Sequence, residues 1–222
     1  GGFRRNGVTE FEGLGADRLA DYATRAGLGS TTGLDLLGET GGLVPNSTWK
    51  ETVVGEPWYL GDTYTFGIGQ GYLTASPMQM AVWTAAIAND GLVLEPRLVR
   101  GFQRDGVLSE LSPVVTHELA NTGDSLAVIR EAMRITAGPG GTASRGQPPG
   151  LIIGGKTGTA EFGPKLADGG YDSHAWYIGF APFDDPQIAV AVYVEYGVGS
   201  FHAAPVARAA FEHYFGLSEA TP

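Results

Sequence analysis

The chain has 222 residues, enough for one domain with a sizeable hydrophobic core. Its net charge of −10, from 14 Lys and Arg against 24 Asp and Glu, argues against binding to nucleic acid or to anionic lipid surfaces. The absence of Cys excludes disulfides, thiolate nucleophiles and zinc–thiolate sites, and no apolar run reaches the roughly 18 residues of a membrane span. We expect no cofactor.

The first part of the chain shows one clear helix signal. Residues 1–15 are interpreted as a loop. Apolar residues recur at helical spacing over residues 16–26, and Gly27 follows as a C-cap, so a short helix is predicted there. Residues 29–62 are rich in Gly, Pro, Ser and Thr and are predicted to form a long connection on the surface.

The strongest helix signal covers residues 76–89. Ser76 is a suitable N-cap, Pro77 occupies the first helical position and Gln79 completes a capping box. Gly91 is expected to end the helix. The predicted buried stripe consists of Met80, Trp83 and Ile87.

The second half of the chain alternates strand and helix signals. One or two strands are expected within residues 93–111, with a turn at Asp105-Gly106. A helix at 124–137 is predicted to bury Leu126, Ile129 and Met133. The remaining elements are strands at 151–160, 173–180 and 187–196 and a helix at 203–215 with Gly216 as its cap. A turn at 184–186 joins the last two strands into an antiparallel hairpin. The predicted fold class is α+β, with an antiparallel sheet packed against helices in a single domain.

The strand at 151–160 contains an unusual polar segment. Its several glycines indicate that another backbone or a ligand comes close. Thr157 and Thr159 are two residues apart and share one face, whereas Lys156 and Gly158 share the other. This pattern predicts an exposed sheet edge with two hydroxyls and a cation, which suits an extended peptide that carries a carboxylate.

The same letters match the phosphate-binding pattern G-x-x-x-x-G-K-[ST] between Gly150 and Thr157. That motif needs a strand before its first Gly and a helix after its last residue. Residues 144–149 contain two prolines and do not form a strand signal, and the glycines and proline of residues 158–164 oppose a helix. We therefore reject nucleotide binding.

Lys156-Thr157-Gly158 resembles the Lys-Thr-Gly signature of penicillin-binding proteins and serine β-lactamases. Several flanking segments are similar to class B penicillin-binding proteins, and residues 58–62 (WYLGD) resemble their elongation-type branch, which serves cell-wall growth and cell shape. The other similar segments are 67–71 (GIGQG), 76–79 (SPMQ), 88–91 (ANDG), 174–182 (HAWYIGFAP) and 192–197 (VYVEYG).

The resemblance implies a role for each residue of the signature. Lys156 would supply positive charge beside the serines of the active site. The hydroxyls of Thr157 and Thr159 would bind the carboxylate of the substrate or of a β-lactam, and the Thr159 N–H would be half of the oxyanion hole. Gly158 would keep the strand edge clear for a peptide. The alternative is an ordinary Gly-rich edge strand without a catalytic role.

Two other elements of the family's active site are missing from this sequence. Only Ser47-Thr-Trp-Lys50 fits Ser-x-x-Lys, but we expect no stable helix there, and no serine is followed by Asn two residues later. We therefore expect residues 1–222 to be a single partial transpeptidase domain. The nucleophile is expected to lie outside this chain, and the fragment alone is expected to be inactive.

The resemblance implies that the parent is a peptidoglycan D,D-transpeptidase that works by serine acyl transfer. Stem peptides and β-lactam antibiotics are the expected ligands, and a membrane glycosyltransferase is an expected partner. The expected location is the extracytoplasmic face of the bacterial cytoplasmic membrane, with the parent anchored upstream of this chain. Two alternatives stay open: a serine β-lactamase, and a non-catalytic β-lactam sensor or peptide-binding pseudo-domain.

The resemblance also places the strand at 187–196 in the centre of the sheet, beside a strand that this chain lacks. Both faces of this strand are apolar, as in a strand covered by helices on both sides. We therefore predict that the fragment self-associates through the uncovered edge, by swapping or strand pairing, unless the N-terminal segment folds over it.

Overall fold

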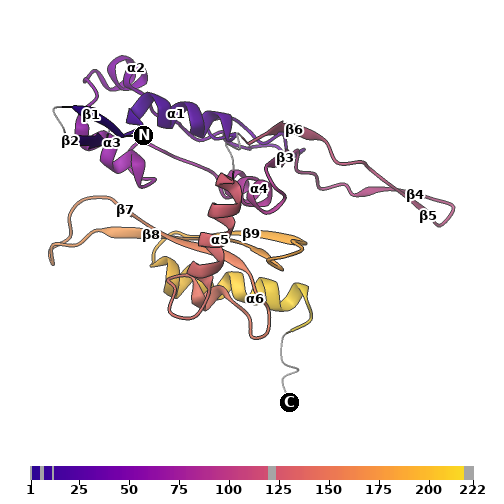
Figure 1. Cartoon of the computed structure of the whole chain (residues 1–222). Coiled ribbons are helices and arrows are strands. Elements are labelled where there is room, and N and C mark those ends of the chain that lie inside the picture. The colour runs from indigo at the N-terminus through magenta and orange to yellow at the C-terminus, as the bar shows by residue number, and fades with distance from the viewer. Residues whose placement is uncertain (1, 6–7, 12, 120–123, 218–222) are drawn as a thin grey trace.

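The computed structural model describes residues 2–5, 8–11, 13–119 and 124–217. Its centre is an antiparallel sheet in the order β7-β8-β9, formed by β7 (Gly154–Phe162), β8 (Asp172–Ala181) and β9 (Ile188–Val194) (Figure 1). Two-stranded ladders pair β1 (Gly2–Arg5) with β2 (Val8–Phe11), β3 (Leu92–Leu94) with β6 (Val115–Glu118), and β4 (Gly101–Arg104) with β5 (Val107–Glu110). The predicted α+β class is confirmed.

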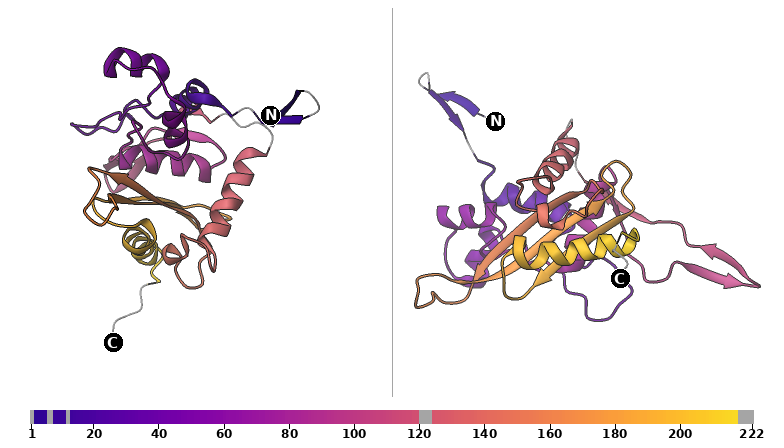
Figure 2. Two further views of the ribbon diagram at one scale, coloured as in Figure 1. Left: turned by 90° about the vertical axis from the view of Figure 1, so that its left-hand side faces the viewer. Right: turned by 90° about the horizontal axis from the view of Figure 1, so that it is seen from below.

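Helices cover both faces of the β7-β8-β9 sheet. α4 (Pro77–Ala88) packs against one face and α6 (Ala204–Tyr214) against the other, while α5 (Ser125–Ala137) packs at the beginning of β7 (Figure 1, Figure 2). The residues of β9 alternate between the two faces, since Ala189 joins the core on the α4 side. The core on the α6 side includes Ile188, Val190, Val192 and Val194.

The N-terminal region holds more regular structure than the sequence predicts. The residues expected to form a loop include the β1-β2 hairpin. α1 (Gly15–Arg25) agrees with the helix predicted at 16–26, and Gly27 follows it with a φ of 89°. The segment expected to be a surface connection contains α2 (Ser47–Trp49), a turn of π-helix at Lys50–Val54 and the start of α3 (Leu60–Gly67).

α4 begins as the sequence predicts. Ser76 Oγ accepts the N–H of Gln79 at 3.1 Å, and Gln79 Oε1 accepts the N–H of Ser76 at 2.8 Å, which are the two halves of a capping box. Gln79 is itself buried, and its Nε2 donates to the carbonyls of Ser30 at 2.8 Å and Gly41 at 2.7 Å. Of the predicted stripe, Ile87 is buried and Met80 and Trp83 are partly buried.

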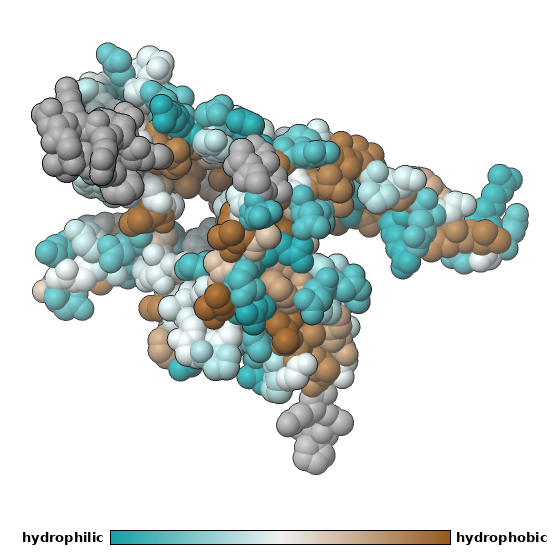
Figure 3. All heavy atoms as spheres, viewed as in Figure 1, coloured by the Kyte–Doolittle hydropathy of each residue, from teal (hydrophilic) through white to brown (hydrophobic). Residues whose placement is uncertain are grey.

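The β4-β5 hairpin projects from the body of the molecule (Figure 1). Its turn is the predicted one: Asp105 and Gly106 have φ values of 51° and 80°. Phe102 is 66% exposed and Val107 67% exposed, and Figure 3 shows apolar atoms beside polar ones along this arm. The arm therefore adds little to the hydrophobic core. β6, which pairs with β3 beyond this arm, is not predicted by the sequence.

The remaining elements lie close to their predicted positions. α5 buries Leu126 and Met133, but Ile129 is 43% exposed, contrary to prediction. β7 begins at Gly154 rather than at residue 151; just before it, Ile153 is fully buried and Ile152 is 54% exposed. Gly216 follows α6 with a φ of 65°. Among the described helices, none has the length and apolar character needed to cross a bilayer.

β9 has an uncovered edge. Within the described residues β8 is the central strand and β9 pairs only with β8, so the strand predicted to be central in the family is an edge strand in this chain. Unpaired N–H and C=O groups on an apolar strand favour pairing with another chain. We expect the isolated chain to self-associate at micromolar concentration, as measured by sedimentation velocity.

Phe102→Ser is the matched control for this experiment. It removes apolar surface from the other exposed strand pair without altering β9, so association through β9 should persist in this variant. A stable monomer whose amides at 188–194 exchange slowly with solvent would contradict the prediction.

Candidate active site

The Lys-Thr-Gly segment lies on β7, at the edge of the sheet. In the β7-β8 register, Lys156 is opposite Ile178, and Thr159 is opposite Ala175. Directly opposed residues of an antiparallel pair place their side chains on the same face. Lys156 therefore shares the face that α4 covers, and Thr159 shares the face that α6 covers. The two threonines and the lysine thus lie on opposite faces of one exposed strand, as the spacing predicts.

Two side chains donate hydrogen bonds to backbone carbonyl oxygens on the uncovered edge of β7. Lys156 Nζ is 2.6 Å from the Thr157 carbonyl oxygen, and Gln70 Nε2 is 3.3 Å from the Thr159 carbonyl oxygen. Alternate residues of an antiparallel strand direct their backbone groups to the same edge, and the N–H and C=O of one residue point together. The N–H of Thr159 therefore faces the open edge, where an extended peptide would meet it.

The Thr159 hydroxyl keeps hydrogen-bonding capacity for a ligand. Thr159 Oγ1 accepts the N–H of Gly199 at 3.3 Å, whereas Thr157 Oγ1 donates to Thr142 Oγ1 at 3.3 Å. A hydroxyl has one proton to donate besides its acceptor lone pairs. The proton of Thr159 is therefore available to an anion at the strand edge. Lys156 is exposed and adds a positive charge to the same strand.

Glycines at the beginning of β7 make room for a buried tyrosine. Tyr177 of β8 is fully buried, and a Cβ placed on Gly155 or on Gly146 would overlap its hydroxyl. Among the described residues this hydroxyl has no hydrogen-bond partner, and burial raises the pKa of Tyr177. Sequence analysis attributes the β7 glycines to an approaching backbone or ligand. For Gly155 the approaching group is instead a side chain of the neighbouring strand.

Gln70 is the contact that sequence analysis misses. It follows α3 and reaches Thr159 across a sequence separation of 89 positions. Figure 3 shows a hollow between the layer that carries α1 and α3 and the sheet below it, and the Gln70–Thr159 hydrogen bond links these two layers. The GIGQG segment signals family resemblance, but nothing in its own letters indicates which strand it contacts.

The Ser-x-x-Lys match lies in a helix, contrary to prediction. Asn46 Oδ1 accepts the N–H of Trp49 at 2.7 Å and so caps α2, which continues into the π-helical turn. The helix was not expected because the sequence prediction took no account of the Asn46 side chain as an N-cap. Ser47 Oγ donates to Asp17 Oδ1 at 2.8 Å.

Lys50 cannot serve Ser47 as a base, because it is buried and paired. Its side chain is 2% exposed, and its Nζ lies 2.6 Å from Asp62 Oδ2 and 4.4 Å from the centroid of the Tyr59 ring. The hydrogen bond to Asp62 raises the pKa of Lys50 and lowers the pKa of Asp62. The ammonium therefore stays charged.

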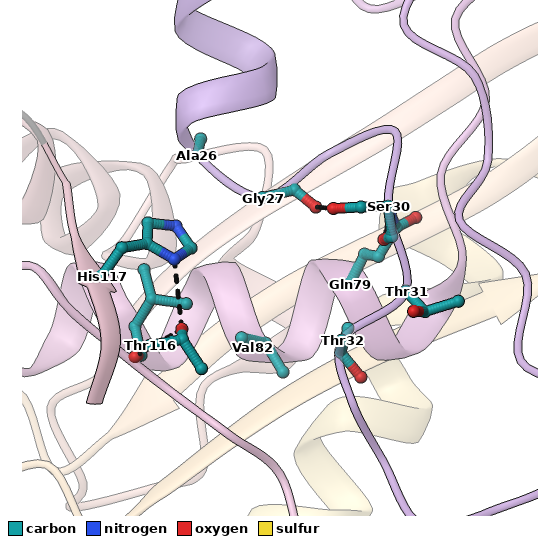
Figure 4. Close-up of a pocket in the computed structure, with 10 residues that line it drawn as sticks. Ala26, Gly27, Ser30, Thr31, Thr32, Gln79, Val82, Thr116 and His117 are labelled. Atoms are coloured by element: carbon teal, nitrogen blue, oxygen red, sulfur yellow. Dashed lines mark hydrogen bonds between the residues drawn. The ribbon is translucent and has the colours of Figure 1, made fainter. Parts of the chain in front are cut away.

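A small pocket lies away from β7. It has a volume of about 160 Å³ and lies between the end of α1, α4 and the β3-β6 ladder (Figure 4). The residues that line it are Ala26, Gly27, Ser30, Thr31, Thr32, Gln79, Val82, Val93, Thr116 and His117. None of them belongs to β7, so the pocket is separate from the candidate site. In the described part of the chain, no group of three or more His, Asp or Glu side chains is placed to hold a metal ion.

Comparison with known families gives a match over most of the chain. The model of the penicillin binding protein transpeptidase domain matches residues 8–212. The peptidoglycan D,D-transpeptidase MrdA of Haemophilus influenzae is 32% identical over 215 residues, which cover 90% of this chain and 33% of that protein. PbpA of Mycolicibacterium smegmatis, also named a peptidoglycan D,D-transpeptidase, is 37% identical over 155 residues, covering 64% of this chain and 30% of that protein.

Solved structures agree with the sequence comparisons. The crystal structure of Pseudomonas aeruginosa PBP2 in complex with WCK 5153 superimposes with a TM-score of 0.74 at 35% identity, covering 90% of this chain and 43% of that one. The complex between PBP2 and MreC from Helicobacter pylori gives a TM-score of 0.71 at 25% identity, covering 91% of this chain and 36% of that one.

The chain spans about one third of the length of the curated relatives it matches. Within that third, the matched family model extends over both the Gly-Gln-Gly and the Lys-Thr-Gly segments. The chain therefore belongs to the penicillin-binding protein transpeptidase family, in its class B, elongation-type branch.

Proposed function

We propose that the parent of this chain is a peptidoglycan D,D-transpeptidase and that this chain supplies the substrate-binding edge of its active site. A serine outside the chain attacks the D-Ala–D-Ala bond of a stem peptide, and D-Ala leaves. The amine of a second stem then attacks the acyl-enzyme, which forms the cross-link and releases the serine. The observation that carries the proposal is the Lys-Thr-Gly segment on an uncovered sheet edge, with the Thr159 backbone directed outward.

The geometry of β7 supports the roles that the family resemblance implies. Thr159 N–H stabilises the developing oxyanion, since it faces the edge where the reacting carbonyl lies. The hydroxyls of Thr157 and Thr159 bind the substrate carboxylate, and Lys156 adds positive charge on the opposite face of the strand. Gly158, between the two threonines, leaves the edge free of a side chain that would obstruct a peptide.

The proposal extends to the partners of the whole protein. The ligands are stem peptides and β-lactams, the partner is a membrane glycosyltransferase, and the site faces the extracytoplasmic side of the membrane. Residues 1–222 form one partial domain, to which the nucleophile and the Ser-x-Asn element are supplied by the rest of the parent.

The experiment that tests the proposal compares the fragment with the parent. The fragment is expected to give no covalent adduct with a labelled penicillin in intact-mass spectrometry. The Ser47 hydroxyl is hydrogen-bonded to Asp17, and Lys50 is paired with Asp62 in a salt bridge. The parent is expected to gain one penicilloyl group on a serine outside residues 1–222. An adduct on the fragment, or an unmodified parent, would refute the assignment.

A further inference from the structure

The backbone of Gln70 is fixed by the way α3 ends. Gly69 has a φ of 80°, its N–H donates to the Phe66 carbonyl at 2.9 Å, and the N–H of Gln70 donates to the Thr65 carbonyl at 2.9 Å. This pair of bonds is the Schellman motif, in which a glycine in the left-handed region terminates a helix. The position of Gln70 is therefore coupled to that of α3.

α3 is in turn anchored at its beginning. Asp62 in its first turn pairs with the buried Lys50, and Asp62 Oδ2 also accepts the N–H of Tyr59 at 2.8 Å. Lys50 Nζ lies 5.8 Å from the centroid of the Tyr72 ring, just after the loop that carries Gln70. The chain is thus held by contacts on both sides of Gln70.

The hydrogen bond that Gln70 makes to β7 is a replaceable one. The 3.3 Å between its Nε2 and the Thr159 carbonyl lies beyond the usual range of an N–H···O bond. Within the described residues, Gln70 Oε1 makes no hydrogen bond. A peptide on the β7 edge needs the Thr159 carbonyl for its own N–H, since main-chain bonds give strand addition its affinity.

We propose that Gln70 is a specificity-determining residue that recognises the main chain of the acyl-donor peptide. This inference rests on the proposed transpeptidase function. The incoming N–H takes the Thr159 carbonyl and releases Gln70 Nε2. Because the helix end prevents the loop from withdrawing, the freed carboxamide, which is both donor and acceptor, hydrogen-bonds the adjacent peptide unit of the donor.

The test uses the parent enzyme, with Gln70→Ala and the control Gln103→Ala on the β4-β5 arm. The probes are a donor peptide that ends in D-Ala–D-Ala and a series of the same peptide with one amide N-methylated at a time. Gln70→Ala is expected to lower kcat/KM for the unmodified peptide about tenfold. For one of the N-methylated peptides, the parent and Gln70→Ala should have the same kcat/KM, because the methyl group removes the N–H with which Gln70 would interact. Gln103→Ala should match the parent, and thermal unfolding of Gln70→Ala should be unchanged.

Other outcomes overturn the inference. A higher kcat/KM in Gln70→Ala would mean that Gln70 merely competes with the substrate for Thr159. An equal loss with every methylated peptide, together with a lower melting temperature, would mean a structural role. Acylation by labelled penicillin is measured in parallel on the parent without substitutions. If that enzyme is not acylated, the proposed transpeptidase function is refuted, whereas the outcomes above refute only the role of Gln70.

Discussion

Thr159→Ala in the parent is expected to slow acylation by a labelled penicillin about 10- to 100-fold. The substitution keeps the backbone N–H but removes a hydroxyl that has a proton left to donate, since its Oγ1 accepts the N–H of Gly199. A hydrogen bond to a carboxylate contributes about 1.5–3 kcal/mol, and each 1.4 kcal/mol corresponds to about a factor of ten. The measurement is the rate of penicilloyl-enzyme formation after rapid mixing.

Thr159→Ser is the matched control for this effect. Thr159 Oγ1 also accepts the N–H of Gly199, so the alanine variant leaves a buried donor unpaired, whereas serine keeps both functions of the hydroxyl. The serine variant should react at nearly the parent rate. Equal losses in both variants, or no loss in either, would contradict a carboxylate-binding role for the hydroxyl.

Gly155→Ala is expected to destabilise the domain by about 3 kcal/mol, the upper end of the usual cost of overfilling a core. The new methyl group would overlap the Tyr177 hydroxyl and lie 2.9 Å from Cζ of the same ring. Tyr177 is fully buried, so the ring has little room to move. The measurement is the free energy of unfolding in denaturant, made on the parent's transpeptidase domain.

Tyr177→Phe distinguishes this overlap from other causes. Removing a buried hydroxyl without a partner should leave stability unchanged or raise it by about 1 kcal/mol. Added to Gly155→Ala it should restore most of the lost stability, since residues in contact couple. It should not rescue Gly146→Ala, whose methyl group would lie 2.6 Å from the ring carbon Cε2. Strict additivity of Gly155→Ala and Tyr177→Phe would contradict this account.

The features predictable from the sequence are those that neighbouring residues decide. The capping box from Ser76 to Gln79 sets the start of α4. Asp105 and Gly106 adopt the positive φ values of a tight hairpin turn. The alternation of Lys156 and Thr157 along β7 follows from strand geometry alone.

The features that escaped prediction depend on partners distant in the chain or on a cap that was overlooked. The Ser-x-x-Lys match at Ser47 is rightly set aside, but the pairing of its Lys50 with Asp62 cannot be predicted from the motif. Gly155 leaves room for the Tyr177 hydroxyl, which lies on the neighbouring strand. Gln70 contacts Thr159 only because the fold brings together residues 89 positions apart. The helix at Ser47 was missed because its Asn46 cap stands among residues that otherwise disfavour helices.

The burial of Lys50 has a practical use in chemical labelling. The lysines of the chain are Lys50, Lys156 and Lys165, and the last two are exposed. An amine-acylating reagent therefore reaches Lys156 on the candidate site and Lys165 in the loop after β7, while the ammonium of Lys50 is shielded. In a footprinting experiment Lys165 serves as the internal reference, and the ratio of modification at Lys156 to that at Lys165 reports occupancy of the β7 edge.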